Sequence, residues 1–222
     1  MNAPICILST KKLRSNQRQF LTNAGFSVIE ADFISISPVA FRLKQRPSLL
    51  LFTSQNAVES VLRNEKAEDL KQIPAVCVGT KTRQMLEDNG FSVLACEPYA
   101  TELKTVIEDS FKQNTIAFFS GNIRSNVLPD AMTRSGIAFE EYTVYKNSER
   151  PVKIEAKTDA ILFFSPSGVR SYLKKNALPE QMCFCIGTTT AEALEVPSNR
   201  IVTAKQQTVE SVIIQCIKHY KK

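Results

Sequence analysis

The sequence contains almost no histidine and no tryptophan. Among its 222 residues His219 is the one histidine, and it lies three positions before the last residue. Histidine is the side chain that most often transfers protons near neutral pH. We therefore do not expect a histidine-based catalytic centre. Residues 165–168 also lack the first glycine of a Gly-x-Ser-x-Gly elbow, so a serine hydrolase is excluded.

Long apolar runs are also absent. No run approaches the roughly 20 residues that a membrane-spanning helix needs. The first residues show no apolar segment followed by a small-residue cleavage site, so no signal peptide is expected. The sequence predicts a cytoplasmic protein without membrane association.

Motifs for metals, disulfides and nucleotides are missing as well. None of the six cysteines forms a Cys-x-x-Cys pair, and most lie in apolar, strand-like runs, which predicts buried reduced thiols. No group of Asp, Glu, His or Cys has metal-ligand spacing. Neither a Walker A sequence nor a Gly-x-Gly-x-x-Gly fingerprint is present.

The net charge of +6 permits an anionic partner but does not require one. The basic residues are scattered, and only residues 218–222 form a dense patch. A nucleic-acid interface would call for a clustered basic stripe with interleaved aromatic residues. We therefore expect no nucleic-acid partner.

The most informative stretch that is present covers residues 49–62. Its apolar start suits a strand buried on both faces, its polar residues 53–56 form turns and caps, and its apolar residues then recur at helical spacing. The stretch recurs 111 residues later, where Ser54 matches Ser165 and Val58 matches Val169. A second echo relates residues 78–82 to residues 186–190.

Around this repeat, strand and helix patterns alternate along the whole chain, which predicts parallel sheets covered on both faces. Strands are predicted at 4–9, 26–30, 49–53, 75–78, 91–95, 115–119, 138–145, 160–164, 183–186 and 200–203. Helices are predicted at 16–24, 57–64, 80–89, 101–112, 125–135, 168–175, 189–195 and 208–220. If the two ends of the chain join, each of two sheets has five strands.

We therefore predict an α/β fold with two similar lobes, one inserted into the other. The discontinuous lobe comprises residues 1–34 and 149–222, and the inserted lobe comprises residues 39–144. Residues 35–38 and 145–148 are predicted to run side by side as a hinge.

Small polar residues follow five of the predicted strands, at residues 53–56, 79–82, 120–122, 165–168 and 187–190. In open parallel sheets, ligands bind beyond the carboxyl ends of the strands. Helix starts there offer unpaired N–H groups to carboxylates or phosphates. Five such loops favour a shared cleft for a polyanion. Each loop could also cap its helix without any ligand; the cap candidates are Asn56, Thr80, Ser167 and Thr188.

Taken in series, these segments resemble the uroporphyrinogen-III synthase family. The motifs are Phe52-Thr53-Ser54-x-Asn56-Ala57-Val58, Val78-Gly79-x-x-Thr82, Val144-Tyr145, Phe163-Phe164-Ser165-Pro166-Ser167-Gly168 and Ile186-Gly187-Thr188-Thr189-Thr190-Ala191. The family implies two flavodoxin-like lobes joined by a two-stranded hinge. It also implies cyclisation of the linear tetrapyrrole hydroxymethylbilane: water leaves, and the last pyrrole ring is inverted through a spiro intermediate. No cofactor or metal is implied.

The resemblance also suggests roles for individual residues. Tyr145 is the candidate acid, because a phenol is protonated at neutral pH and could donate to the leaving hydroxyl; the alternative is that it only packs at the hinge. Asn56 stands where some members carry arginine. Lys81 and Arg124 are candidate carboxylate partners, or else solvated charges. The predicted substrate-binding residues are Ser54, Asn56, Thr80, Thr82, Gly121, Ser165, Ser167, Gly168, Thr189 and Thr190.

The resemblance predicts a monomeric enzyme of haem or other tetrapyrrole biosynthesis. Its partners would be the polycarboxylate substrate and, transiently, the enzyme that produces hydroxymethylbilane. Two other classes stay open: a cytosolic two-lobe receptor for an anionic ligand, and a structural or regulatory module without activity.

Overall fold

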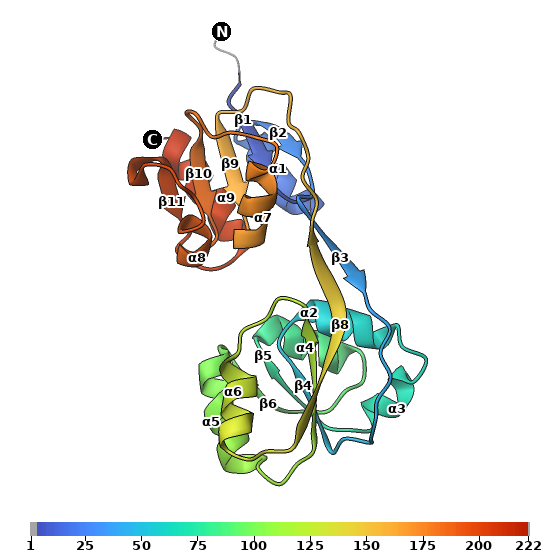
Figure 1. The fold of residues 1–222 in the computed structure, drawn as a ribbon. Coiled ribbons are helices and arrows are strands. Elements are labelled where there is room, and N and C mark those ends of the chain that lie inside the picture. The colour runs from blue at the N-terminus through green and yellow to red at the C-terminus, as the bar shows by residue number, and fades with distance from the viewer. Residues whose placement is uncertain (1–3, 222) are drawn as a thin grey trace. The chain divides into compact units, whose positions relative to one another are not determined.

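The computed structural model describes residues 4–221, so residues 1–3 and 222, at the ends of the predicted discontinuous lobe, lie outside the described residues. The described chain divides into two compact units (Figure 1). Unit 1 comprises residues 4–35 and 148–221, and unit 2 comprises residues 36–147.

Unit 1 contains a five-stranded sheet in the order β11-β10-β9-β1-β2, and every neighbouring pair is parallel. Two strands come from the start of the chain and three from its end, which confirms that the two terminal regions build one sheet. The strands are β1 (Cys6–Ser9), β2 (Ser27–Glu30), β9 (Ala160–Phe163), β10 (Met182–Cys185) and β11 (Ile201–Thr203).

Helices cover both faces of this sheet. Leu21 of α1 and Val212 of α9 pack with Ile7 on one face, and Val169 of α7 packs with Phe163 on the other. The helices of unit 1 are α1 (Ser15–Asn23), α7 (Pro166–Leu173), α8 (Thr188–Ala191) and α9 (Val209–Tyr220), with a 3-10 turn at η1 (Ser198–Arg200).

Unit 2 is built around a sheet in the order β3-β8-β7-β4-β5-β6. Five of its strands match the sequence prediction; the sixth, β3, is expected from the sequence only as an extended connector. Directly after β3, the Val39 N–H donates a hydrogen bond to the Val144 carbonyl at 2.8 Å. The strands are β3 (Ile34–Pro38), β4 (Leu49–Phe52), β5 (Ala75–Val78), β6 (Val93–Glu97), β7 (Ile116–Gly121) and β8 (Phe139–Glu149).

The faces of the unit 2 sheet are covered in the same manner. Val58 of α2 and Leu86 of α4 pack on one face, and Leu103 of α5 and Met132 of α6 pack on the other. The helices are α2 (Gln55–Leu62), α3 (Ala67–Lys71), α4 (Thr80–Asp88), α5 (Ala100–Ser110) and α6 (Val127–Arg134). The sequence does not predict α3, because its five residues are too few for a periodic apolar pattern.

The two sheets share one topology. Strands β11-β10-β9-β1-β2 of unit 1 follow the same order as β6-β5-β4-β7-β8 of unit 2. The central strands β4 and β9 are buried at every position, as their unbroken apolar runs predict. α4 and α6 end at Gly90 and Gly136, whose positive φ angles of 86° and 65° close the last turns.

One predicted helix is much shorter in the structure. The pattern predicts a helix over 189–195, but α8 ends at Ala191. After it the chain turns, so that the Leu194 N–H donates to the Ala191 carbonyl at 3.0 Å. This turn places Leu194 in the core, where it is 6% exposed, so packing decided its conformation rather than helical continuation.

Two further sequence expectations concern membranes and cysteines. Within residues 4–221 no helix is both long enough and apolar enough to cross a bilayer. All six cysteines are free thiols, four of them buried. Burial raises the pKa of the Cys216 thiol to about 12, which makes it an inert, apolar side chain at neutral pH.

Candidate functional site

In unit 2, polar side chains gather where the parallel strands end. The carboxyl ends of β5, β4, β7 and β8 lie side by side in the sheet, and the turns after β4, β5 and β7 enter helices. This carboxyl end of the sheet is where open α/β proteins bind ligands. It carries the predicted site residues Ser54, Asn56, Thr80, Thr82, Gly121 and Tyr145.

Tyr145 is held at this end of the sheet by its hydroxyl. The Ser54 hydroxyl donates to the Tyr145 phenol oxygen at 3.2 Å, while the Ser54 oxygen accepts from the Ala57 N–H at 3.2 Å as the cap of α2. Among residues 4–221, the Tyr145 hydroxyl is the donor of no hydrogen bond. Its proton is therefore free for another acceptor, although the Tyr145 side chain is only 8% exposed.

Gly121 makes room for the Tyr145 ring. The register between β7 and β8 shifts at Ser120 and Gly121, so that Gly121 lies opposite Tyr145. A Cβ atom at Gly121 would lie 2.4 Å from Cζ of the phenol and 2.7 Å from its oxygen. No side chain fits there without moving the ring. The sequence predicts Gly121 as a substrate contact, and the structure gives it this steric role.

Asn122 fastens the backbone of Tyr145 and of Asn147, two residues further on. Its N–H donates to the Tyr145 carbonyl at 3.2 Å. Its side-chain amide donates to the Asn147 carbonyl at 3.2 Å and accepts from the Asn147 N–H at 2.7 Å. The sequence places Asn122 in a polar loop but carries no signal for this clamp, because its partner lies 25 residues away.

Arg124 is committed to a neighbouring carboxylate. Its guanidinium donates from Nε and Nη2 to the two Glu141 oxygens, each at 2.6 Å, and the Ser120 hydroxyl donates to the same carboxylate at 2.6 Å. The Arg124 hydrogen bonds hold the pKa of Glu141 below its ordinary value. Glu141 is thus the carboxylate partner of Arg124, which corrects the expectation of a solvated charge there.

Two helix caps in unit 2 differ from those expected from the sequence. Asn56 and Thr80 are the cap candidates from the sequence, but the cap of α2 is Ser54 and the position before α4 is Gly79. Asn56 is half-buried and Thr80 exposed. Thr82 lies further inside and is 4% exposed.

Unit 1 repeats the serine cap that Ser54 forms in unit 2. Ser165 caps α7 and accepts from the Gly168 N–H at 3.1 Å, and the hydroxyls of Ser165 and Ser167 are 3.2 Å apart. The cap candidate Ser167 is therefore the second residue inside the helix. The Gly168 N–H is used by the cap itself and is not free for a ligand.

The other predicted residues of unit 1 follow β10. Thr188, another cap candidate, is the first residue of α8, and Gly187 precedes it as the cap position. Thr189 is exposed, whereas Thr190 is 1% exposed. Because α8 has only four residues, it supplies little of the helix dipole on which the anion-binding expectation depended.

Sequence reasoning missed a set of cations at the carboxyl end of the unit 1 sheet. The turn between β1 and α1 contains Lys11, Lys12 and Arg14, all exposed. Three basic residues within residues 11–14 are the available signal, and the description of the basic residues as scattered overlooks it.

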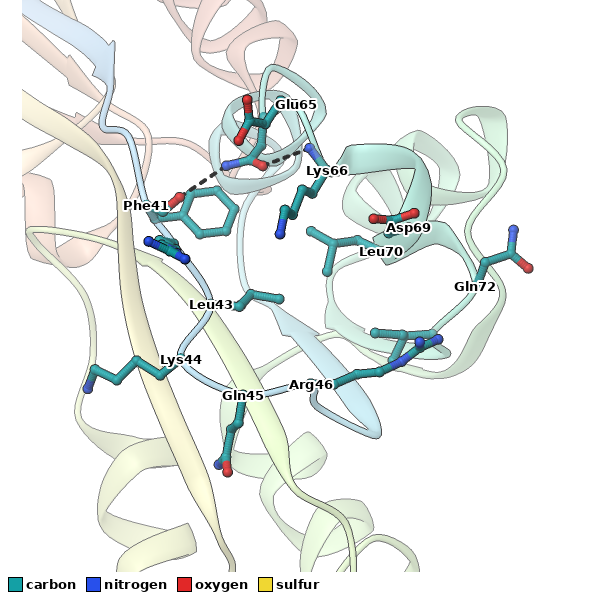
Figure 2. A pocket seen from close by; sticks show the side chains of 13 residues that line it. Phe41, Leu43, Lys44, Gln45, Arg46, Glu65, Lys66, Asp69, Leu70 and Gln72 are labelled. Atoms are coloured by element: carbon teal, nitrogen blue, oxygen red, sulfur yellow. Dashed lines mark hydrogen bonds between the residues drawn. The ribbon is translucent and has the colours of Figure 1, made fainter.

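A cavity of about 650 Å³ lies elsewhere in unit 2 (Figure 2). Its lining comes from residues 41–46 and 64–73, which lead into the amino ends of β4 and β5. None of the predicted site residues lines it. The candidate site lies at the opposite end of the sheet, where helix starts and turn residues converge. Across residues 4–221, no group of His, Cys, Asp and Glu could hold a metal ion.

A sequence profile of the family described as uroporphyrinogen-III synthase HemD matches residues 16–214 of the chain. This match covers most of both units. A direct comparison with curated proteins found no match.

Solved structures resemble the whole chain. One is the uroporphyrinogen-III synthetase of Helicobacter pylori 26695, with a TM-score of 0.73 and 19% identity over 97% of this chain and 99% of that chain. Another is a mutant uroporphyrinogen III synthase of the extremely thermophilic bacterium Thermus thermophilus, with a TM-score of 0.64 and 14% identity over 97% of this chain and 98% of that chain. At these identities the likeness shows a common fold.

Proposed function

Because the chain belongs to the uroporphyrinogen-III synthase family, we propose that it converts hydroxymethylbilane to uroporphyrinogen III. The reaction removes the terminal hydroxyl of a linear tetrapyrrole as water. The last pyrrole ring attacks through its substituted carbon, and the resulting spiro intermediate rearranges so that this ring closes inverted. The chain is thus an enzyme of tetrapyrrole biosynthesis, and a non-catalytic receptor is not favoured.

The observation that best supports Tyr145 as the acid is the direction of the hydrogen bond at its hydroxyl. Ser54 donates to the phenol oxygen, so the phenol proton can point to a ligand at the carboxyl end of the unit 2 sheet. In the proposed step Tyr145 gives this proton to the departing hydroxyl as its C–O bond breaks, and water leaves. The first ring becomes an azafulvene cation, and closure of the macrocycle releases a proton that can restore the phenol.

Substrate arms are proposed to bind at the turns that enter the helices. The first N–H groups of α2, α4 and α7 have no partner within their helices and favour carboxylates. Ser54, Asn56 and Thr80 lie at two of these helix starts and Ser167 at the third, with Thr189 at the short α8. Positioning of the flexible tetrapyrrole substrate then supplies much of the catalysis. One cleft shared by both units stays a prediction from the sequence.

The test is an isomer analysis of the product. The chain is incubated with hydroxymethylbilane, and the uroporphyrinogens are oxidised and separated. The proposed function gives mainly isomer III. Without catalysis the substrate closes spontaneously to isomer I, so isomer I alone, at the rate of a protein-free sample, would reject the function and favour the receptor or the inactive module.

We further propose that the enzyme acts as a cytoplasmic monomer that needs no cofactor or metal and receives its substrate in transient contact with the producing enzyme. Sedimentation at working concentration should give the mass of one chain. Activity should be unchanged after treatment with a chelator. The mass of a dimer would contradict the proposed monomer. A loss of activity after chelation would contradict the proposed independence from a metal.

A further inference from the structure

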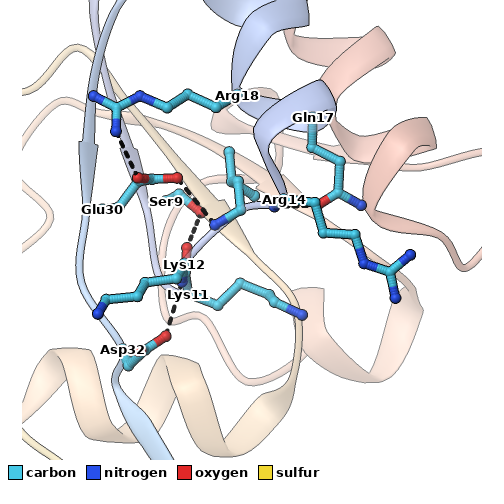
Figure 3. A network of polar contacts seen from close by, with 9 residues as sticks. Ser9, Lys11, Lys12, Arg14, Gln17, Arg18, Glu30 and Asp32 are labelled. Carbon is cyan, nitrogen blue, oxygen red and sulfur yellow. Dashed lines mark hydrogen bonds and ion pairs between the residues drawn. The ribbon is translucent and has the colours of Figure 1, made fainter.

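The turn between β1 and α1 presents three cations at the carboxyl end of the unit 1 sheet (Figure 3). Lys11, Lys12 and Arg14, called the basic turn below, are all exposed. β1 lies between β2 and β9 in the sheet, so the basic turn follows one of the inner strands. This is the position at which a parallel sheet meets its ligand.

The backbone of the basic turn is fixed by neighbouring carboxylates. The Lys12 N–H donates to Oδ1 of Asp32 at 2.8 Å, and the Leu13 N–H donates to Oε1 of Glu30 at 2.9 Å. The Ser9 hydroxyl donates to the Lys11 carbonyl at 2.6 Å. Figure 3 shows these contacts converging on the turn. The three cationic side chains therefore project from an ordered backbone.

The same carboxylates do not neutralise the basic turn. The second oxygen of Glu30 pairs with Arg18 at 3.1 Å, and Asp32 accepts from a backbone N–H rather than from a lysine ammonium. Within residues 4–221, no ion pair reaches Lys11, Lys12 or Arg14. The cations of the turn together with Arg18 outnumber these two carboxylates, so the local charge is positive.

The basic turn is also continuous with a turn that carries predicted substrate contacts. The Lys11 ammonium lies 5.9 Å from the centre of the Phe164 ring, and Phe164 directly precedes Ser165. The Thr10 hydroxyl, at the start of the turn, lies 3.9 Å from the point where a Gly168 Cβ would be. An anionic group seated near Ser165 would thus meet Lys11 as well.

We infer that the basic turn binds carboxylate arms of the substrate. The inference rests on the proposed function and names residues that neither the family resemblance nor the repeat identified. Lysine and arginine side chains carry the charge on flexible aliphatic stems, which suits arms that move while the macrocycle closes. Because the contacts hold carboxylate arms and not the reacting atoms, they stabilise the bound substrate and the transition state alike, which lowers KM and leaves kcat unchanged.

The test is a triple variant, Lys11→Gln, Lys12→Gln and Arg14→Gln. We expect KM for hydroxymethylbilane to rise about tenfold, the combined effect of three exposed ion pairs, with kcat within about twofold of wild type. KM of the wild type should rise with added salt, and this dependence should be weaker in the variant. Lys12→Gln alone should raise KM by about twofold, which keeps the test valid if the triple variant folds poorly.

The matched control removes the same charge at the amino end of the same sheet. Lys153, Lys157 and Lys175 are exposed and have no ion pair among the described residues, and all three are changed to Gln. KM should stay within about twofold of wild type. An equal rise in KM in both variants, or an unchanged KM in the basic-turn variants, would overturn the inference. In both of these outcomes, the proposed function still stands if the wild-type protein forms isomer III.

Discussion

Units 1 and 2 share a sheet order and a repeated cap but differ in what they present at the carboxyl ends of their strands. Unit 2 presents a phenol fixed by Ser54, Gly121 and Asn122. Unit 1 presents the cations of the basic turn, which no ion pair reaches within residues 4–221. The shared part lies in buried strands and helix starts, whereas the difference lies in turn residues. A duplicated scaffold can therefore keep its fold while its turns diverge in chemistry.

The contrast is sharpest in one pair of equivalent turns. The turns after β1 and after β7 hold the same place in the two sheets, and each meets a carboxylate from the neighbouring strand. In unit 2 Glu141 neutralises Arg124. In unit 1 Glu30 binds the Leu13 N–H and Arg18 instead, so the cations of the turn remain available. The turn after β7 is held by its own ion pair, whereas the turn after β1 leaves its cations available to an anion.

The largest expected effect tests the phenol of unit 2. Tyr145→Phe should lower kcat by more than about tenfold, because a general acid contributes at least that much when it protonates a leaving group. Steady-state kinetics with isomer analysis measure it. Tyr142→Phe, a control on the same strand whose hydroxyl donates to Glu140 at 2.7 Å, should leave kcat near normal. Near-normal turnover of Tyr145→Phe would remove this residue from the acid role.

The next effect tests the space around that phenol. Gly121→Ala places a methyl group within 2.4 Å of the Tyr145 ring. We expect kcat to fall about tenfold as the ring shifts, and the free energy of unfolding to fall by about 1–3 kcal/mol from overpacking. Both are measured on the purified variant, by kinetics and by urea unfolding.

A matched glycine in unit 1 serves as its control. Gly187 has extended backbone with φ of −168°, and a Cβ there would meet Gln207 at 3.5 Å, an ordinary contact. Gly187→Ala should therefore change neither quantity appreciably. If both glycine variants behaved alike, the close approach of Tyr145 to Gly121 would not explain the loss.

A smaller effect separates the two copies of the serine cap. Ser54→Ala and Ser165→Ala should each lower the free energy of unfolding by about 1 kcal/mol, since each removes one N-cap. Only Ser54 also contacts the Tyr145 hydroxyl, so only Ser54→Ala should lower kcat, by about threefold. Urea unfolding and kinetics of the pair test this, and equal kcat values for the two variants would contradict it.

The smallest effect concerns pH and the Arg124–Glu141 pair. Because Arg124 lowers the folded-state pKa of Glu141 below its ordinary value of 4.5, the pair stabilises the fold above that pH. The stabilisation, at most about 1 kcal/mol for a partly exposed pair, is lost as the pH falls through the lowered pKa.

Glu141→Gln should therefore be less stable than wild type at neutral pH, and the difference should shrink on acidification. Urea unfolding at a series of pH values measures this. Glu59→Gln, at an exposed position of α2, should follow the wild-type curve. A constant difference between Glu141→Gln and wild type at every pH would show that the charge of Glu141 is not responsible.

Much of the scaffold could be predicted, since it depends on local patterns. The apolar run of β4 and the helical spacing after it identify strand and helix without any knowledge of neighbours. Gly90 and Gly136 mark two helix ends, and the repeat of Ser54 at Ser165 indicates two related units. Helix boundaries do not follow from the local pattern in the same way: both Ser54 and Asn56 can cap α2, and only the structure shows that Ser54 does so.

Burial and periodicity act over a few residues, so the amino-acid order suffices to specify the parallel sheets, their helical layers and the polar turns at the strand ends. Which residues those turns contact depends on the folded chain. Gly121 meets Tyr145, Asn122 meets Asn147, and Glu141 rather than solvent meets Arg124. These contacts join residues far apart along the chain, and no local pattern encodes which side chains a folded sheet brings together.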